Sequence, residues 1–384
     1  MRPPLAGLAV LLMFSAACSD SSGASSTPKP ASLALGQGHV CQISAGATSC
    51  WGSGNIGQLG MGSLPADTTP LALEGTPAFV SIAAGQSHTC AVDADGAAWC
   101  WGSNSHGELG TGTLADETCG SFPCQTRPAR VATNQRFRSL AAGVWFTCGL
   151  TTSGAVLCWG ANDASQLGND ATSDSCEGLA CSRTPVLAAA GARFADVSAA
   201  RASTCALDQD GTVWCWGLDV MTHRFSDQPA RLNSDVKFVR LAAGGLHTCA
   251  LTSDHSAWCW GIDALGAGAG TLESDHPVQV TGAHKFTLLA SGRFTTCGMD
   301  QAGIVWCWGA NTDGAAGNEP VGAEIRFDDP VQVSGSLRFT AIAGGSTTYC
   351  GVTTTGSTAC WGRGAEGQLV NGHQSSTLPV VIGG

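Results

Sequence analysis

The dipeptide Trp-Gly recurs seven times along this 384-residue chain, each time within a longer stretch of similar sequence. The seven tryptophans, 44 to 58 residues apart, are Trp51, Trp101, Trp159, Trp216, Trp260, Trp308 and Trp361. A repeat of this length forms one supersecondary unit that buries its apolar face only against its neighbours. The chain is also longer than the roughly 250–300 residues that one compact core supports. The sequence therefore predicts an array of seven similar units.

Each repeat contains four segments typical of short β-strands. Two flank a Gly- or Asp-containing turn, as in the stretch TCALDQDGTVWCWG that ends at Gly217. An apolar run such as 79–85 comes before this hairpin, and a Pro-led segment such as 277–280 forms the remaining strand. Four short antiparallel strands make one propeller blade, so the predicted fold is all-β: a seven-bladed β-propeller of four-stranded blades.

The two ends of the chain suggest how the ring closes. The first repeat enters at Leu33 without a Pro-led strand ahead of it, and the last repeat is followed by such a strand at 377–382. We therefore expect the C-terminal strand to complete the first blade, which would pair two exposed sheet edges.

The cysteine spacing predicts the register of the hairpins. If Cys205 faces Cys215, then Leu207 faces Val213 and residues 209–211 form a three-residue loop with Gly in the left-handed position. In the first repeat the pair is one residue closer, and the same register leaves the two-residue loop 45–46. Directly opposed residues of antiparallel strands lie within disulfide reach.

Nineteen cysteines are present, and all except Cys18 fall into nine close pairs. The pairs are Cys41 with Cys50, Cys90 with Cys100, Cys119 with Cys124, Cys148 with Cys158, Cys176 with Cys181, Cys205 with Cys215, Cys249 with Cys259, Cys297 with Cys307 and Cys350 with Cys360. An even set in an exported chain is typical of disulfides. The alternative is zinc, but a tetrahedral site needs four convergent ligands and seven of these pairs lack the short ligand spacing. We predict nine disulfides and no metal site.

The N-terminal residues have the pattern of an export signal. Arg2 precedes an apolar stretch at 5–14 and small residues at 15–17, which is too short to span a bilayer. Small residues before Cys18 resemble the bacterial lipobox, with Ser15 where that motif favours Leu. The predicted organisation is a signal peptide at 1–17, a lipidated Cys18 with a Ser-rich tether at 18–32, and the propeller at 33–384. Simple secretion is the alternative. Ser19 favours the outer membrane under the enterobacterial sorting rule.

Three recurring motifs carry a family resemblance. A GxxHTC-like lead, the CWG strand and an N-x-x-G-Q-L-G-like tail, seen at 57–60, 106–110 and 367–369, cover nearly all of residues 33–384. Together they resemble the regulator of chromosome condensation repeat family. The resemblance implies a seven-bladed propeller but transfers no activity, because one fold hosts many functions. Family members that are similar in architecture, a plant photoreceptor and a secreted β-lactamase inhibitor, bind through a propeller face.

Catalytic signatures are absent from the sequence: it contains no G-x-S-x-G, no phosphate-binding P-loop and no H-E-x-x-H. His39, His88 and His247 precede the first hairpin Cys by two places, where other repeats have Phe, Ser or Thr, so a structural hydrogen bond is the favoured interpretation. The net charge of −11 argues against nucleic acid as a partner. We predict neither enzymatic activity nor a cofactor.

A two-residue turn of variable identity stands just ahead of each first hairpin Cys. The seven turns are Gln37-Gly38, Gln86-Ser87, Val144-Trp145, Arg201-Ala202, Gly245-Leu246, Arg293-Phe294 and Ser346-Thr347. Equivalent turns emerge on one propeller face, and the matching positions of the plant photoreceptor carry its interaction residues. Because aromatic and Arg side chains dominate binding hot spots, Trp145, Arg201, Arg293 and Phe294 are the candidate contacts. The alternative is that Trp145 and Phe294 pack between blades.

The predicted function is a monomeric, envelope-anchored binding module that holds a protein or an envelope polymer and touches the membrane only through its lipid. The alternatives are an inhibitor of a hydrolase and an enzyme with a site on the propeller axis. Two Cys-bounded insertions, at 118–124 and 175–181, break the repeat and could form a rigid rim for recognition or a stapled loop that resists proteolysis.

Overall fold

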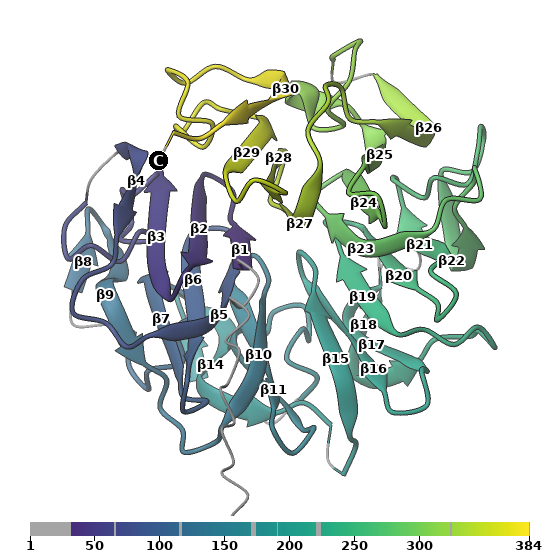
Figure 1. Ribbon diagram of the computed structural model, residues 1–384. Coiled ribbons are helices and arrows are strands. Elements are labelled where there is room, and N and C mark those ends of the chain that lie inside the picture. Colours follow the sequence, from purple (N-terminus) through teal and green to yellow (C-terminus); the bar gives the residue numbers. More distant parts are fainter. Residues whose placement is uncertain are drawn as a thin grey trace, which may run out of the picture.

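Seven antiparallel sheets surround a central axis in the computed structural model (Figure 1). It describes residues 32–64, 67–114, 117–169, 174–189, 191–219, 224–322 and 325–383. Five sheets have four strands and two have five. The prediction of a seven-bladed propeller of four-stranded blades is confirmed. The predicted signal segment and Cys18 lie outside the described residues, as does all but the last residue of the tether.

Every blade uses its strands in the same order from the axis outward. The innermost strands are β1 (Ser32–Leu35), β5 (Phe79–Ala84), β10 (Phe137–Ala142), β15 (Phe194–Ala199), β19 (Arg240–Ala243), β23 (Phe286–Ser291) and β27 (Phe339–Gly344). The second strands are β2 (His39–Ser44), β6 (His88–Asp93), β11 (Phe146–Thr151), β16 (Ser203–Asp208), β20 (His247–Leu251), β24 (Thr295–Asp300) and β28 (Thr348–Thr353).

The outer half of each blade repeats in the same way. The third strands are β3 (Ala47–Gly52), β7 (Ala98–Ser103), β12 (Val156–Ala161), β17 (Val213–Asp219), β21 (Ala257–Ile262), β25 (Val305–Ala310) and β29 (Thr358–Gly362). The outer strands are β4 (Asp67–Ala72), β9 (Phe122–Arg130), β14 (Leu179–Leu187), β18 (Arg224–Arg231), β22 (Glu273–Gln279), β26 (Arg326–Gln332) and β30 (Ser376–Val381). Two further strands, β8 (Glu117–Cys119) and β13 (Asp174–Cys176), extend blades two and three, and a short 3-10 helix, η1 (Thr312–Gly314), lies in blade six.

The hairpin register agrees with the prediction. Cys205 pairs with Cys215 and Leu207 with Val213, and Gly211 has a positive φ of 78°. In blade one Ser44 pairs with Ala47, which leaves the two-residue loop with Ala45 and Gly46 both at positive φ. Positive φ at both loop residues is the mark of the tight turn that matches strand twist.

All nine predicted disulfides are present, and seven of them bridge a hairpin between the second and third strands of a blade. The seven are Cys41 with Cys50, Cys90 with Cys100, Cys148 with Cys158, Cys205 with Cys215, Cys249 with Cys259, Cys297 with Cys307 and Cys350 with Cys360. Each joins Cα atoms 4.0 to 4.1 Å apart, as expected for opposed residues.

The remaining two disulfides lie in the insertions that break the repeat. Cys119 with Cys124 staples the β8–β9 hairpin, and Cys176 with Cys181 staples the β13–β14 hairpin. The predicted pairing is therefore confirmed for all eighteen cysteines. So many disulfides indicate an oxidising, extracellular environment.

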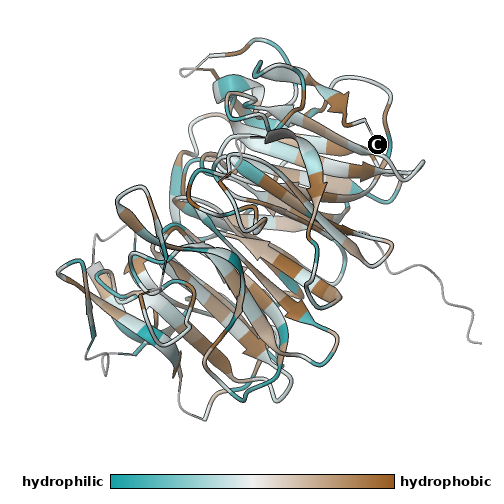
Figure 2. Cartoon of the chain, turned by 90° about the vertical axis from the view of Figure 1, so that its left-hand side faces the viewer, coloured by the Kyte–Doolittle hydropathy of each residue, from teal (hydrophilic) through white to brown (hydrophobic). Residues whose placement is uncertain are grey.

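Neighbouring blades pack through a disulfide on one side and a tryptophan on the other. Trp216 of blade four is buried against the Cys148–Cys158 bridge of blade three, and all seven interfaces repeat this arrangement. In six blades a Phe also packs on the same Trp, as Phe79 stacks on Trp101 with ring centroids 5.7 Å apart. Figure 2 shows the resulting pattern, with hydrophobic residues concentrated along the strands.

Six of these tryptophans also donate a hydrogen bond to the preceding blade. The acceptor is a backbone carbonyl in the tail that follows that blade's third strand. The pairs are Trp51 with Gln368 (2.9 Å), Trp101 with Gln58 (2.9 Å), Trp159 with Glu108 (2.9 Å), Trp216 with Gln166 (3.0 Å), Trp308 with Ala264 (2.8 Å) and Trp361 with Ala315 (3.1 Å). The indole of Trp260 makes no hydrogen bond within the described residues.

The predicted role of the C-terminal strand is wrong. Strand β30 pairs with β29, in register Cys360 to Val380, and so completes the last blade and not the first. Blade one has an outer strand of its own, β4, which pairs with β3. The physical reason is that each Pro-led strand follows the hairpin it pairs with, so the chain starts on an inner strand and ends on an outer one.

The ring closes by side-chain packing between blades seven and one. Strand β1 packs against β27, and Leu35 and Trp51 share an apolar cluster with Leu369 and Ile382. Thr358 Oγ1 donates to Gln42 Oε1 at 2.6 Å across the same junction. Closure therefore uses the same contacts as the other interfaces. Within the described residues, no helix has the length and apolar character that crossing a membrane requires.

The indole bond predicts a difference between two conservative substitutions. Trp101→Phe keeps an aromatic ring in the interface but leaves the Gln58 carbonyl without its indole donor, which should lower the free energy of unfolding by about 1 kcal/mol beyond the lost packing. Trp260→Phe removes no such bond and should destabilise the protein less. Denaturant titration of both variants measures the difference, and equal losses would contradict the role assigned to the indole.

Candidate partner-binding face

The seven variable turns lie between the first and second strand of each blade and therefore emerge on one face around the axis (Figure 1). Backbone hydrogen bonds tie several of them together. Val144 N donates to the Arg201 carbonyl at 3.4 Å, and Arg293 N donates to the Ser346 carbonyl at 2.8 Å. Because neighbouring blades hold each other's turns, the face is a rigid platform.

Trp145 stands at the end of its turn with 40% of its surface exposed. It is not tucked between blades: its indole stacks on the His106 imidazole of blade two, with centroids 4.6 Å apart and planes within 9°. The sequence did not indicate His106 as a neighbour, because His106 lies in the variable part of the tail. The stack fixes the indole and leaves part of it open to a ligand.

Arg293 and Phe294 form a second pair of candidate contact residues. The guanidinium carbon of Arg293 lies 4.8 Å from the Phe294 ring centroid, which is a cation–π distance. Arg293 is exposed and Phe294 is partly buried. Arg201 is also exposed, next to the turn of Trp145. The structure thus places the candidate residues in two groups, separated by the turn of blade five.

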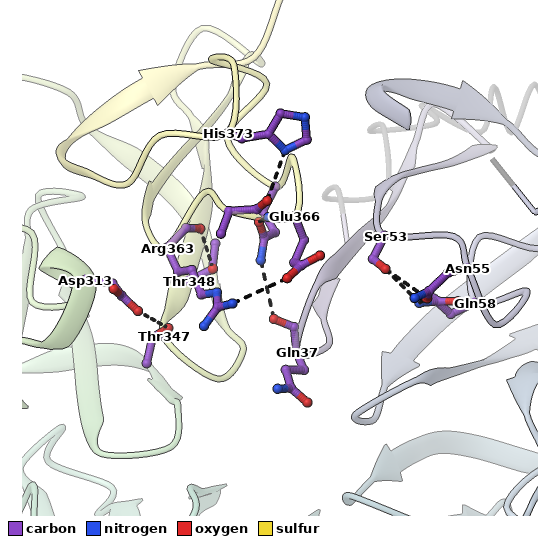
Figure 3. Close-up of polar contacts among 12 residues, drawn as sticks. Gln37, Ser53, Asn55, Gln58, Asp313, Thr347, Thr348, Arg363, Glu366 and His373 are labelled. Atoms are coloured by element: carbon purple, nitrogen blue, oxygen red, sulfur yellow. Dashed lines mark hydrogen bonds and ion pairs between the residues drawn. The ribbon is translucent and has the colours of Figure 1, made fainter. Parts of the chain in front are cut away.

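The remaining part of the face is polar, as Figure 3 shows for blades six, seven and one. Thr347 Oγ1 donates to Asp313 Oδ2 at 3.2 Å, and Arg363 lies 3.4 Å from Glu366. Gln368 Nε2 donates to the Gln37 carbonyl at 3.4 Å across the blade junction. These groups contact one another, so the aromatic and Arg side chains of blades three to six are the better candidates for contact with a partner.

The three histidines beside the turns have a structural role, as predicted. His39, His88 and His247 are buried, and each Nε2 lies 2.6 to 2.9 Å from a Thr hydroxyl of the next blade. Thr89 donates its own proton to the Gln58 carbonyl, so His39 Nε2 carries the proton and donates it to Thr89. Burial lowers the pKa of His39 and His247 to about 4 and that of His88 to about 3. All three are neutral at physiological pH.

The described residues contain no group of three or more His, Cys, Asp or Glu side chains able to hold an ion. The hairpin aspartates instead cap their own turns. Asp208 Oδ1 accepts from the backbone N–H groups of Asp210 and Thr212, both at 2.9 Å, and Oδ2 accepts from the Trp214 indole. Asp208 therefore stabilises its own hairpin turn.

The family profile described as the RCC1-like domain matches residues 47–383, nearly the whole propeller. The chain belongs to the RCC1-like domain family.

Relatives of this RCC1-like protein are distant. It is 30% identical over 155 residues to the human probable E3 ubiquitin-protein ligase HERC3, a match covering 36% of this chain and 14% of that protein. It is 27% identical over 189 residues to the Arabidopsis thaliana ultraviolet-B receptor UVR8, covering 48% of this chain and 40% of the receptor. The chain thus spans less than half of the length of either relative.

Solved structures of other proteins share the fold. Human WBSCR16 superposes with a TM-score of 0.74 at 19% identity, covering 87% of this chain and 94% of that one. Prp20p of Saccharomyces cerevisiae, described with its binding properties to Gsp1p and histones, gives 0.73 at 21% identity, covering 88% and 85%. At these identities the likeness establishes the fold alone.

Glu108 provides a pH-dependent test of this face, because its side chain accepts from the backbone N–H of His106, which stacks on Trp145. It is fully buried, and Oε2 accepts from His106 N at 2.7 Å while Oε1 accepts from Ser103 Oγ at 2.5 Å. Burial raises its pKa above the ordinary value. The folded state therefore retains a proton that the unfolded state loses, and stability falls as pH rises through the folded-state pKa.

Glu108→Gln should remove this loss, since Gln fills the equivalent position at 58, 166 and 368. We expect the variant to raise the melting temperature more at pH 8 than at pH 5. The two increases should differ by about 1–2 °C or more. The reverse change Gln166→Glu is the matched control and should lower it at pH 8. Calorimetry at both pH values measures the shifts, and a pH-independent effect of Glu108→Gln would refute the buried-carboxyl argument.

Proposed function

We propose that this protein is a non-catalytic binding module that holds a partner protein on the face formed by its seven turns. The observation that carries the proposal is the exposed Trp145, held by its stack on His106 among rigid turns. Rigid aromatic and Arg side chains lose little conformational freedom on binding and dominate interface hot spots. Prp20p, which shares the fold, is described as binding Gsp1p and histones.

The charge distribution indicates which partner surface suits the face. Arg201 and Arg293 are exposed on either side of blade five, although the chain as a whole carries a net charge of −11. A partner surface with carboxylates beside an apolar patch would match these two Arg side chains and Trp145. An envelope polymer with the same chemistry is the alternative ligand.

Two substitutions test the face. Trp145→Ala and Arg293→Ala should each weaken partner binding by about 1–2 kcal/mol, roughly 5- to 30-fold in Kd, because each removes an exposed contact group. Arg193→Ala is the matched control: Arg193 is exposed and precedes β15, at the opposite end of the strand that leads to Arg201. A partner captured from envelope extract by the immobilised propeller provides the binding assay.

Melting temperatures of the three variants separate binding from folding. The proposal requires unchanged melting temperatures together with weaker binding for Trp145→Ala and Arg293→Ala only. Loss of stability with unchanged affinity per folded molecule would show that these side chains belong to the packing and would overturn the proposal.

We further propose that Cys18 is lipidated and that residues 19–30 tether the propeller to the cell envelope, with the outer membrane as the preferred location. The support is the export-like N-terminal sequence together with disulfides that need an oxidising compartment. Cys18→Ser should move the protein from the membrane fraction to the soluble fraction, because one thiol carries the anchor. Immunoblotting of the fractions checks this, and retention of the variant in membranes would exclude the anchor.

A further inference from the structure

Among the described residues, the groove between blades four and five has no counterpart of the tail that fills the other grooves. Strands β17 and β18 are paired up to their adjoining ends, Leu218 with Phe225 and Asp219 with Arg224. The chain runs only from Gly217 to Pro229 between the Trp-Gly motif and the outer-strand proline, which is the shortest such connection in the seven repeats. A cavity of about 290 Å³ lies here, lined by residues that include Cys215, Leu218, Leu232, Leu246, Thr248 and Trp260.

Two hydrogen-bond donors face this groove without the acceptor that their counterparts have. In blade one the Gln58 carbonyl accepts from both Trp101 Nε1 (2.9 Å) and Thr89 Oγ1 (3.0 Å). Glu108 and Gln166 accept in the same way from the Thr and Trp of their next blade.

The counterparts in blade five are Thr248 and Trp260. Within the described residues, the only hydrogen-bond partner of the Thr248 hydroxyl is Cys205 Sγ at 4.0 Å, and Trp260 Nε1 has none. Trp260 is nevertheless buried, with 7% of its surface exposed. Trp260 lines the cavity and its N–H has no protein acceptor among the described residues, so a ligand carbonyl placed there would accept its hydrogen bond.

A sequence difference in blade four leaves the Thr248 hydroxyl without the His partner that its counterparts have. In three other interfaces a His from the preceding blade bonds the equivalent Thr, as His39 bonds Thr89 at 2.8 Å. Blade four has Ser203 at that position, and no hydrogen bond joins it to Thr248 in the described part of the chain. The groove is also more open to solvent. Cys215 is partly exposed, whereas the other thirteen hairpin cysteines are buried.

The six filled grooves define what the ligand must contain. After each accepting residue comes a buried Leu or Ala, such as Leu59, Leu109 and Leu167, all at most 1% exposed. The next residue is usually a Gly at positive φ, and a Cβ there would stand 2.7 to 2.9 Å from the Trp indole at Gly60, Gly110 and Gly168. A ligand that fits the groove therefore contains any residue followed by Leu and then Gly. The backbone carbonyl of the first residue must be free to accept hydrogen bonds.

We propose that the groove between blades four and five binds an exposed x-Leu-Gly turn of another protein, which supplies the missing tail. The carbonyl of x accepts from Trp260 Nε1 and Thr248 Oγ1, and the Leu side chain fills the cavity. A second copy of this chain is not the partner, because its own six tails are already buried in its own grooves. The groove reaches the turn Gly245-Leu246 and so adjoins the partner-binding face, although its lining includes none of the candidate contacts Trp145, Arg201, Arg293 and Phe294.

A synthetic peptide with the sequence of residues 55–62, NIGQLGMG, serves as the probe. Added to the intact disulfide-bonded propeller, it should shift the ¹H–¹⁵N indole resonance of Trp260 in a saturable manner. Leu→Asp or Gly→Ala within the peptide should abolish the shift, and these changes leave the protein untouched. Absence of a saturable Trp260 shift at about 2 mM peptide, a concentration that would detect even millimolar affinity, would overturn the proposal.

Protein variants test the two donors. Thr248→Val keeps the side-chain shape but removes the hydroxyl, and should weaken peptide binding by about fivefold or more. Thr89→Val makes the same change in a filled groove and should leave peptide binding unchanged. Equal affinity of the wild type and Thr248→Val, or an equal loss in both variants, would refute the assignment of this groove.

Discussion

The hydrogen bond from a Trp indole to a backbone carbonyl of the preceding blade is the contact on which the ring depends. It joins strand three of one blade to the tail of another, so it can form only when both blades are folded and in register. Trp101 illustrates the consequence: its ring is buried against the Cys41–Cys50 bridge while its N–H reaches Gln58. The same contact therefore buries a large aromatic surface and gives the indole N–H its hydrogen-bond acceptor.

Much of the repeated sequence follows from this contact. The tail Gly is required because a side chain at Gly110 would collide with the Trp159 indole, 2.7 Å from the position of its Cβ. The residue before it must be a compact aliphatic group, since Leu109 has no exposed surface. Opposite the indole, a disulfide takes the place of a bulky apolar pair, holds the hairpin closed and restrains the unfolded chain. A chain with 12% charged residues can therefore form seven small cores instead of one large one.

The sequence was informative where the interactions are local and less so where they join distant repeats. Strand register and loop length followed from the spacing of Cys205 and Cys215, because both residues belong to one hairpin. Ring closure was assigned wrongly because the sequence alone did not reveal whether a Pro-led strand pairs with the hairpin before or after it. The stack of Trp145 on His106 and the open groove at Trp260 also depend on contacts between blades. The open groove could have been predicted from the sequence, because the interval between Trp216 and Trp260 is short and contains no G-Q-L-G tail.

Hydrogen–deuterium exchange of the indole protons, followed by NMR, tests the central claim most directly. The indole protons of Trp51, Trp101, Trp159, Trp216, Trp308 and Trp361 are bonded across blade interfaces and should exchange only when the ring opens, with nearly equal protection. The Trp260 proton has no acceptor in the part of the chain that the structure describes, and it should exchange faster by about tenfold or more. Equal protection of Trp260 and the other six, or fast exchange of those six, would contradict the account.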